Sequence, residues 1–217
     1  MVVSKPLPAA TRSLLEETVE RYHEHLLDDD EALDYLEARG IDQWTARTYR
    51  LGLVVDPIPD HEYMRGRLSI PYTVPRGGPV GCKFRCVQPH DCKDLDHPKY
   101  LSHTGMGKRL YNVLAFKIPS DVIAITEGEL DAVVATEAGI PAIAVPGVKG
   151  WSDAWAYCFE GYRRVLVIGD GDTDGRAFAE RLADQIESAR AVPMPDKHDV
   201  TSLVLEQGVE ALLARCA

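Results

Sequence analysis

The 217-residue sequence lacks any apolar run of transmembrane length, and its first ten residues lack the apolar core of a secretory signal peptide. The sequence also lacks a disulfide framework, because its five cysteines are an odd number without the spacing of paired cysteines. Internal repeats and low-complexity segments are absent as well. These absences argue against a membrane or secreted protein, and we expect a soluble intracellular one.

Charge is spread unevenly along the chain, although the total at pH 7 is −10. Residues 61–117 carry a net charge of +6, whereas residues 1–60 carry −7 and residues 118–217 carry −9. A basic segment between two acidic ones predicts an anion-binding surface that faces a metal-binding surface. A uniformly acidic protein would repel nucleic acid, but this one can attract it locally.

Residues 165–175 read V-L-V-I-G-D-G-D-T-D-G and are the most informative stretch. Residues 165–168 have the length and β-branched content of a buried parallel strand. Ligands of open α/β sheets bind beyond the carboxyl ends of the strands, which is where the next residues fall. Carboxylates stand there at alternate positions and suit Mg²⁺: Asp170, Asp172 and Asp174. An ordinary Asp–Gly turn is the alternative, whereas a calcium loop would have Glu at the position of Arg181.

The remainder of residues 119–217 alternates between expected strands and helices, which predicts an α/β domain with a mostly parallel four-stranded sheet. The strands are expected at residues 122–125, 142–145, 165–168 and 191–194. Glu127 follows the first strand, Asp131 lies one helical turn later, and Asp199 lies in another strand-end loop. Carboxylates from three loops at one sheet edge can bind one or two divalent ions, as in phosphoryl-transfer sites.

Residues 1–118 are predicted to form a separate α+β part, with helices first and a basic β-hairpin after them. The hairpin is expected to pair residues 65–74 with residues 80–87 through a turn at 76–79. Its cations recur at every second position, so in-register pairing would place four on one face: Arg65, Arg67, Lys83 and Arg85. Such crowding favours an anionic ligand over a merely solvated face, which is the alternative. Further cations near aromatic residues suit nucleic acid: Lys99, Lys108 and Arg109.

Three cysteines and two histidines fall within sixteen residues: Cys82, Cys86, His90, Cys92 and His97. Their spacing is not that of two close ligand pairs, and Cys82 and Cys86 lie on a predicted strand. We therefore expect no zinc site.

Taken together, these motifs resemble the catalytic core of DnaG-type primases, whose acidic half is a Toprim domain with a Rossmann-like fold. Residues 126–131, T-E-G-E-L-D, resemble the E-G-x-x-D motif of that family, and residues 170–176, D-G-D-T-D-G-R, resemble its D-G-D-x-x-G-R motif. The upstream landmarks of the primase RNA-polymerase domain follow in order, at residues 35–41, 67–71, 81–85, 98–102 and 110–112. The likeness runs from about Leu14 to the last residue.

The resemblance implies roles for individual residues. Glu127 would be the acidic residue nearest the chemistry, as a metal ligand or general base. It would form the catalytic set with Asp170 and Asp172, which would bind Mg²⁺ or Mn²⁺. Asp131 and Asp199 would complete a two-metal site. Four basic residues match family positions that bind template or nucleotide phosphates: Arg67, Arg85, Lys99 and Lys108. The pattern of cations adds Arg65, Lys83 and Arg109 to this set.

The implied function is that of a DNA-directed RNA polymerase of the primase type, acting in a bacterial or infected-host cytoplasm. It would join ribonucleoside triphosphates into a short RNA primer on single-stranded DNA during replication, beside the replicative helicase of a primosome. No zinc-binding domain is visible before Leu14, the chain stops at Ala217, and Arg109 replaces a family glycine. We therefore expect a compact phage or mobile-element core whose zinc domain and helicase-binding function lie on other polypeptides.

Two other functions stay open on the sequence. A Toprim nuclease would use the same carboxylates, although the landmarks of the basic strand pair favour the primase. A non-catalytic replisome module that binds single-stranded DNA would need no metal site, yet all five acidic positions are filled.

Overall fold

The computed structural model describes residues 7–75, 77–92, 94–95, 97–103 and 105–217 and divides into two compact units. The first unit contains the residues up to Glu37 and Asp42–Gly107, and the second contains Ala38–Ile41 and Lys108–Ala217. The domain limits expected from the sequence, 1–118 and 119–217, concern independently folding parts and stay a prediction.

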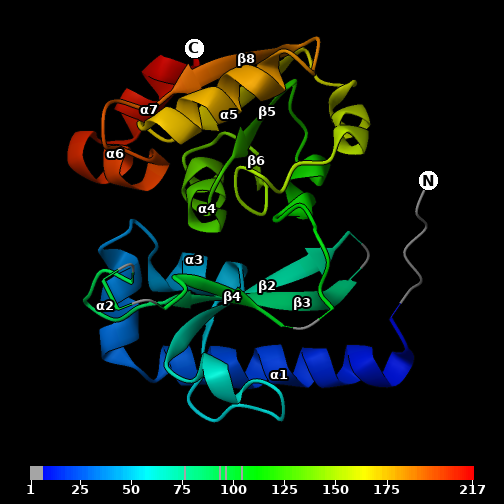
Figure 1. Ribbon diagram of the computed structural model, residues 1–217, viewed down its shortest axis with the longest axis vertical. Coiled ribbons are helices and arrows are strands. Elements are labelled where there is room, and N and C mark those ends of the chain that lie inside the picture. Colours follow the sequence, from blue (N-terminus) through cyan, green and yellow to red (C-terminus); the bar gives the residue numbers. More distant parts are fainter. Residues whose placement is uncertain (1–6, 76, 93, 96, 104) are drawn as a thin grey trace. The chain divides into compact units, whose positions relative to one another are not determined.

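The first unit joins helices to an antiparallel sheet with the strand order β1-β2-β3-β4 (Figure 1). Its elements are α1 (Ala9–Leu27), α2 (Asp30–Glu37), α3 (Gln43–Thr48), β1 (Gly52–Leu53), η1 (Glu62–Met64), β2 (Arg67–Val74), β3 (Gly77–Cys86) and β4 (Tyr100–Ser102). Val19 and Tyr22 of α1 are buried one helical turn apart and pack against Phe84 of β3. Helix α1 therefore covers the face of the sheet on which Phe84 lies.

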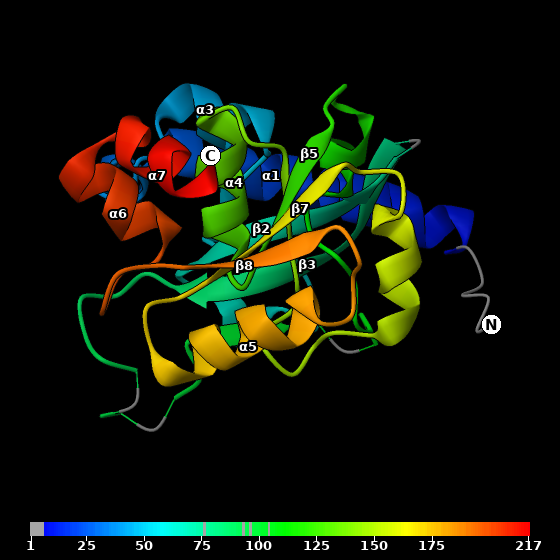
Figure 2. The same cartoon turned by 90° about the horizontal axis from the view of Figure 1, so that it is seen from above.

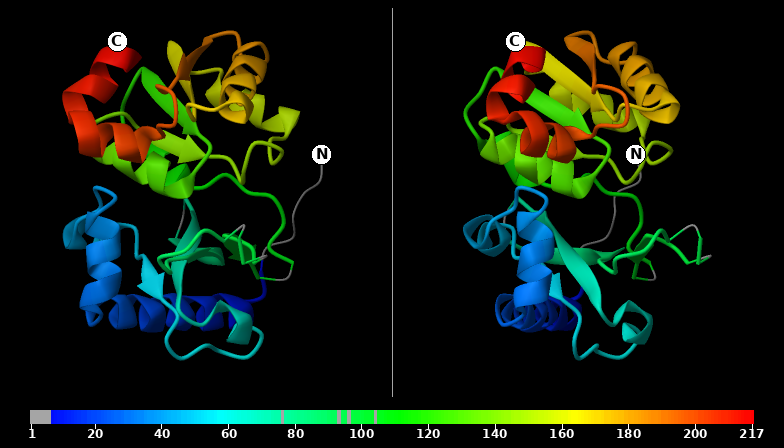
Figure 3. Two further views of the ribbon diagram at one scale, coloured as in Figure 1. Left: turned by 60° about the vertical axis from the view of Figure 1, so that its left-hand side comes forward. Right: turned by 90° about the vertical axis from the view of Figure 1, so that its left-hand side faces the viewer.

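The second unit is the expected α/β fold, with four parallel strands in the order β6-β5-β7-β8. Its elements are η2 (Val113–Lys117), β5 (Val122–Thr126), α4 (Glu129–Glu137), β6 (Ala142–Ala144), η3 (Asp153–Phe159), β7 (Arg164–Gly169), α5 (Thr173–Ala183), β8 (Ala189–Pro193), α6 (Val200–Gln207) and α7 (Val209–Cys216). Figure 2 shows α4 and α5 on opposite sides of these strands. Helices α6 and α7 pack against each other (Figure 3), and α6 also packs against α4.

The core of the second unit follows from the alternation of side chains along each strand. Ile123 and Ile125 of β5 lie beside Val165 and Val167 of β7, and all four pack in one cluster with Phe178 of α5. Both faces of the parallel sheet are covered, and the inner strands β5 and β7 are accordingly mostly buried and apolar, although β7 begins with the exposed Arg164.

Several element boundaries differ from the sequence expectation. The turn expected at residues 76–79 is shorter, because Gly77 already belongs to β3, while Arg76 lies outside the described residues. The helix expected from residue 176 begins at Thr173, because Asp172 caps it. Within the described part of the chain, no helix has the length and apolar character needed to cross a membrane.

Candidate functional site

The structure brings Glu127 and Asp170 together at the carboxyl edge of the parallel sheet. Strands β5 and β7 are neighbours, with Thr126 paired to Ile168, and each acidic residue follows its strand within two residues of that pair. The backbone N–H of Asp170 donates a hydrogen bond of 3.0 Å to Oε1 of Glu127. The side chain of Glu127 and the backbone of Asp170, more than forty residues apart in sequence, therefore meet at the sheet edge where the sequence analysis expected acidic residues from different strand ends.

Asp131, in the first turn of α4, is a buried member of the acidic set, with 8% of its surface exposed. Its Oδ1 accepts hydrogen bonds from the backbone N–H of Thr201 at 3.1 Å and from the Thr201 hydroxyl at 2.9 Å. This contact joins α4 to the start of α6. The sequence analysis did not identify Thr201, although it stands two residues after Asp199 in the same strand-end loop.

Asp172 and Asp199 each cap a helix at this edge. Oδ1 of Asp172 accepts a bond of 2.8 Å from the N–H of Gly175, at the start of α5. Oδ1 of Asp199 accepts a bond of 2.7 Å from the N–H of Ser202, at the start of α6. Helix starts favour negative charge, so both side chains have a structural role in addition to the metal-binding role predicted for them.

The electrostatics of this edge favour a divalent cation. Burial raises the pKa of the Glu127 carboxyl, and the charges of Asp172 and Asp131 raise it further. Burial, with the charges of Asp199 and Asp170, raises the pKa of Asp131 to about 7. Carboxylates crowded in this way repel one another, and Mg²⁺ or Mn²⁺ bound by their oxygens would relieve the repulsion. Carboxylate oxygens are the ligand type that such an ion prefers, but among the described residues the ligand atoms that lie within 4.8 Å of one another are those of the Cys and His side chains described below.

The raised pKa of Asp131 predicts a specific pH dependence of stability. Its carboxyl favours the neutral form when folded, so the stability it contributes is complete below pH 4 and is lost as the pH rises through about 7. Asp131→Asn should therefore gain stability relative to the wild type between pH 4.5 and pH 8. Because the pKa of Asp131 rises from 3.8 to about 7, the gain in the free energy of unfolding is at most about 4 kcal/mol.

Urea unfolding of both proteins at the two pH values, without divalent ions, measures this difference. Asp153→Asn, at an exposed position of η3, is the matched control and should show no such trend. Adding Mg²⁺ at pH 8 should stabilise the wild type more than Asp131→Asn. A gain that is equal at both pH values would contradict the assignment.

The basic hairpin differs from the sequence expectation in one respect. In the structure Arg67 is paired with Cys86, whereas Arg85 is paired with Leu68. Directly paired residues share a face and neighbours along a strand alternate, so Arg67 lies on the opposite face from Arg85 and Lys83. The prediction of four cations on one face is therefore wrong, because the register is one residue away from the one it required.

Arg85 and Lys83 nevertheless form an organised basic cluster with Tyr100. Arg85 donates to the hydroxyl oxygens of Tyr35 at 2.8 Å and Tyr100 at 2.5 Å. Lys83 Nζ lies 4.5 Å from the centre of the Tyr100 ring, which is within cation–π range. The sequence indicated the cations but not the two tyrosines that orient them.

The remaining basic residues divide between the two units. Arg65 donates to the carbonyl of Val55, and Arg67 donates to the carbonyl of Pro98 at 3.0 Å. Lys99 belongs to the same unit, whereas Lys108 and Arg109 belong to the unit of the acidic edge. Whether the basic strands face the acidic edge concerns both units and stays a prediction.

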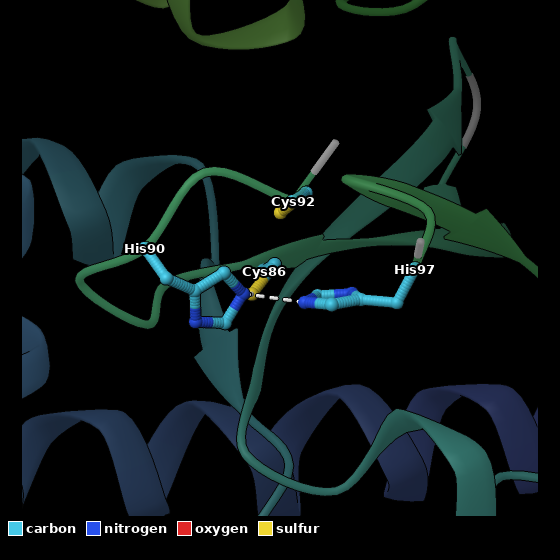
Figure 4. Close-up of side chains that lie close together, drawn as sticks. All are labelled: Cys86, His90, Cys92 and His97. Atoms are coloured by element: carbon cyan, nitrogen blue, oxygen red, sulfur yellow. Dashed lines mark hydrogen bonds between the residues drawn. The ribbon is translucent and has the colours of Figure 1, made fainter. Parts of the chain in front are cut away.

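The structure also gathers four of the five Cys and His residues that the sequence analysis set aside. Cys86, His90, Cys92 and His97 place their ligand atoms within 4.8 Å of one another (Figure 4). Cys82 is excluded because it is fully buried in the core beneath β3, where burial raises the pKa of its thiol to about 11. The expectation of no zinc depended on spacing along the sequence, whereas the fold of the loop after β3 brings these side chains together in space.

Comparison with known proteins agrees with this architecture. Residues 122–210 match the model of the Toprim domain family. The Gene 57 protein of Mycobacterium phage D29 is 42% identical over 157 residues, which cover 70% of this chain and 98% of that protein. A DnaG primase catalytic domain solved with single-stranded DNA has a TM-score of 0.73 at 23% identity, over 94% of this chain and 77% of that one.

The Aquifex aeolicus primase, solved with its zinc-binding and RNA polymerase domains, has a TM-score of 0.77 at 22% identity. The similarity covers 93% of this chain and 59% of the Aquifex chain. At 22–23% identity the solved structures establish only the fold of this chain. The phage protein, at 42% identity, establishes the family to which the chain belongs. The chain belongs to the family of the mycobacteriophage Gene 57 protein and combines a Toprim domain with the fold of a DnaG-type primase catalytic core.

Proposed function

We propose that this chain is the catalytic core of a DNA primase, which joins ribonucleotides into a short RNA primer on single-stranded DNA. The observation that carries the proposal is the contact of Glu127 with the backbone of Asp170, beside the buried Asp131, at the carboxyl edge of a Toprim sheet. This arrangement supports a divalent-ion site formed by the expected acidic residues. The sequence motifs and the primase-core fold support the same conclusion.

Each acidic residue has a proposed part in the reaction. Glu127 and Asp170, with Asp172, Asp131 and Asp199, would hold one or two Mg²⁺ or Mn²⁺ ions, which when bound supply positive charge for the phosphates and the attacking oxygen. Oε1 of Glu127 already accepts the Asp170 N–H, so Oε2 is the atom placed to take a proton from the primer hydroxyl. The raised pKa of Glu127 suits that proton transfer.

The basic residues would hold the polyanionic substrates. Arg85 is oriented by two tyrosine hydroxyls, so little side-chain entropy is lost when it binds a phosphate. Lys83 would extend this surface on the same face of the hairpin, whereas Arg67, on the opposite face, would bind a phosphate there. Arg65 and Lys99 of the first unit, and Lys108 and Arg109 of the second, would bind further phosphates. A DnaG primase catalytic domain of similar fold binds single-stranded DNA, which supports that template as the partner.

We further propose that the chain works in the cytoplasm of a bacterial host during phage replication. A replicative helicase and a separate zinc-domain protein would be its partners in the primosome. The Aquifex primase, which has zinc-binding and RNA polymerase domains in one chain, supports the need for such a zinc domain.

A primer-synthesis assay tests the proposal. The full chain is incubated with single-stranded DNA, labelled ribonucleoside triphosphates and Mg²⁺, with and without a zinc-domain protein of the same phage. We expect short RNA that depends on both template and Mg²⁺. A parallel reaction with labelled DNA and no nucleotides detects nuclease activity. Cleavage without synthesis would assign the site to a nuclease, and DNA binding with neither activity would assign the chain to a binding module.

The basic cluster makes a separate prediction about DNA binding. Arg85→Ala should weaken binding of single-stranded DNA by about tenfold and reduce the slope of log K against log salt by about 0.7, the value for one lost phosphate contact. Fluorescence anisotropy with a labelled oligonucleotide measures both quantities. Arg12→Ala is the matched control, because Arg12 is exposed on α1, which covers the other face of the sheet. Equal losses in the two variants would contradict a specific role for Arg85.

A further inference from the structure

The described residues of the loop between β3 and β4 bury little apolar surface. Residues 87–99 separate the two strands, and the described ones among them are exposed or half-buried. Leu95 is 60% exposed, so this side chain does not contribute to an apolar core. The loop makes polar contacts, such as the bond from His97 N–H to Cys92 O at 3.1 Å and the bond from Arg67 to Pro98 O at 3.0 Å. Loops of this length without secondary structure commonly have a functional reason.

Four side chains of this segment nevertheless converge on one point, as Figure 4 shows. Cys86 is the last residue of β3, and His90, Cys92 and His97 come from the loop that follows. Sγ of Cys86 lies 3.7 Å from Nε2 of His90, and all four ligand atoms lie within 4.8 Å of one another. In a tetrahedral zinc site, bond lengths of about 2.0–2.3 Å place the ligand atoms roughly 3.3–3.8 Å apart. The widest separation therefore needs to shorten by about 1 Å, while the hydrogen-bonded Nε2 atoms of the two histidines need to move apart to admit the ion.

The chemistry of the four atoms selects the ion. The Nε2 atoms of His90 and His97 face each other as hydrogen-bond partners, so a metal cation can bind between them in place of a shared hydrogen. Two thiolates and two neutral imidazoles would neutralise Zn²⁺ completely. Sulfur and nitrogen donors in a tetrahedral set favour Zn²⁺ over Mg²⁺ or Mn²⁺, which prefer oxygen. This group thus differs in chemistry from the carboxylates of the Toprim sheet.

We propose that Cys86, His90, Cys92 and His97 bind one structural Zn²⁺ ion that fixes the β3–β4 loop onto the basic sheet. The ion would supply the cross-link that the loop lacks in apolar contacts. It would also affect a predicted phosphate-binding residue. Arg67 Nη2 lies 3.3 Å from Nδ1 of His97, and zinc on Nε2 would leave the ring hydrogen on Nδ1. His97 could then no longer accept a hydrogen bond from Arg67, which would free that donor for a ligand.

Metal analysis of the full chain tests this proposal independently of any primase activity. The protein is treated with a chelator under reducing conditions, incubated with Zn²⁺, passed through a desalting column and analysed for bound metal. We expect one zinc per chain in the wild type and loss of that zinc in Cys86→Ser and in Cys92→Ser. With Co²⁺ instead, we expect the strong visible absorption of tetrahedral thiolate coordination, which Mg²⁺ sites do not give.

Two controls make the test decisive. Cys158→Ser removes an exposed cysteine of η3, outside the group, and should keep the full zinc content. Cys92→Ser changes a half-buried loop position, so this variant should fold even if Cys86→Ser at the end of β3 does not. Circular dichroism establishes folding in each case. Absence of zinc from the reduced wild type, or its retention by a folded Cys92→Ser protein, would overturn the proposal.

Discussion

Glu127→Gln should lower primer synthesis by at least about a hundredfold while leaving the affinity for single-stranded DNA within about twofold of the wild type. The amide keeps the shape of the side chain and can still accept the Asp170 N–H through its oxygen. It removes the negative charge and the capacity to take a proton, which are the two properties that the proposed reaction needs. Asp170→Asn should have a similar effect, because it removes charge from the neighbouring strand tip.

The measurement is the rate of RNA formation on a single-stranded template at saturating nucleotide and Mg²⁺, together with DNA affinity by anisotropy. Glu137→Gln is the matched control, since Glu137 is exposed at the end of α4, the helix that follows Glu127, and should leave the rate unchanged. If Glu127→Gln or Asp170→Asn makes primers at the wild-type rate, the catalytic assignment is wrong.

The second large effect is expected from Gly171→Ala. A Cβ atom at position 171 would lie 1.7 Å from the carbonyl oxygen of Pro195 and 2.6 Å from its carbonyl carbon. These atoms belong to the backbone and cannot rotate away. The two segments are also held by bonds from Gly171 N–H to His198 O at 2.7 Å and from Lys197 N–H to Gly171 O at 3.0 Å. The substitution must therefore separate the loop of Asp170 from the loop that leads to Asp199.

We expect Gly171→Ala to lower the free energy of unfolding by about 3 kcal/mol or more and to reduce primer synthesis strongly. Urea unfolding at pH 7 gives the first quantity. Gly161→Ala is the control, because no heavy atom lies within 4 Å of a Cβ built at that glycine, and it should change stability by less than about 0.5 kcal/mol. Equal stability of the two variants would show that the two loops are not tightly joined.

Glycine at position 175 has a related explanation that links the sequence motif to the site. A Cβ atom there would lie 2.4 Å from the carbonyl oxygen of Asp170 and 2.6 Å from Oε1 of Glu127. Gly175 thus allows the backbone of the β7 tip and the Glu127 side chain to approach the start of α5. In the sequence this glycine indicated only a sharp turn.

The acidic edge could be predicted from the sequence because strand order and strand ends determine it. Short apolar runs followed directly by Glu127 and Asp170 locate both residues at the carboxyl ends of parallel strands, whatever the details of packing. The contact of Asp131 with Thr201 could not be predicted in this way, since it depends on how α6 packs against α4. Nothing in the periodicity of either helix reports that packing.

The basic hairpin and the Cys–His group show two other limits. A change of one residue in register moves a side chain to the other face of a sheet, so Arg67 was predicted on the wrong side although its strand was correctly identified. The grouping of Cys86 with His97 depends on the path of an irregular loop, which hydrophobic patterns do not describe.

The central claim is that carboxylates from the tips of β5 and β7 bind the same divalent ion. Titrating the isotope-labelled chain with Mn²⁺ and recording amide signals by NMR tests this most directly, because Mn²⁺ broadens the signals of nearby residues. We predict that the amides of residues 127–131 and 170–175 broaden together at low Mn²⁺, and that this effect is lost in Glu127→Gln. Broadening at only one of these segments, or at neither, would contradict the account.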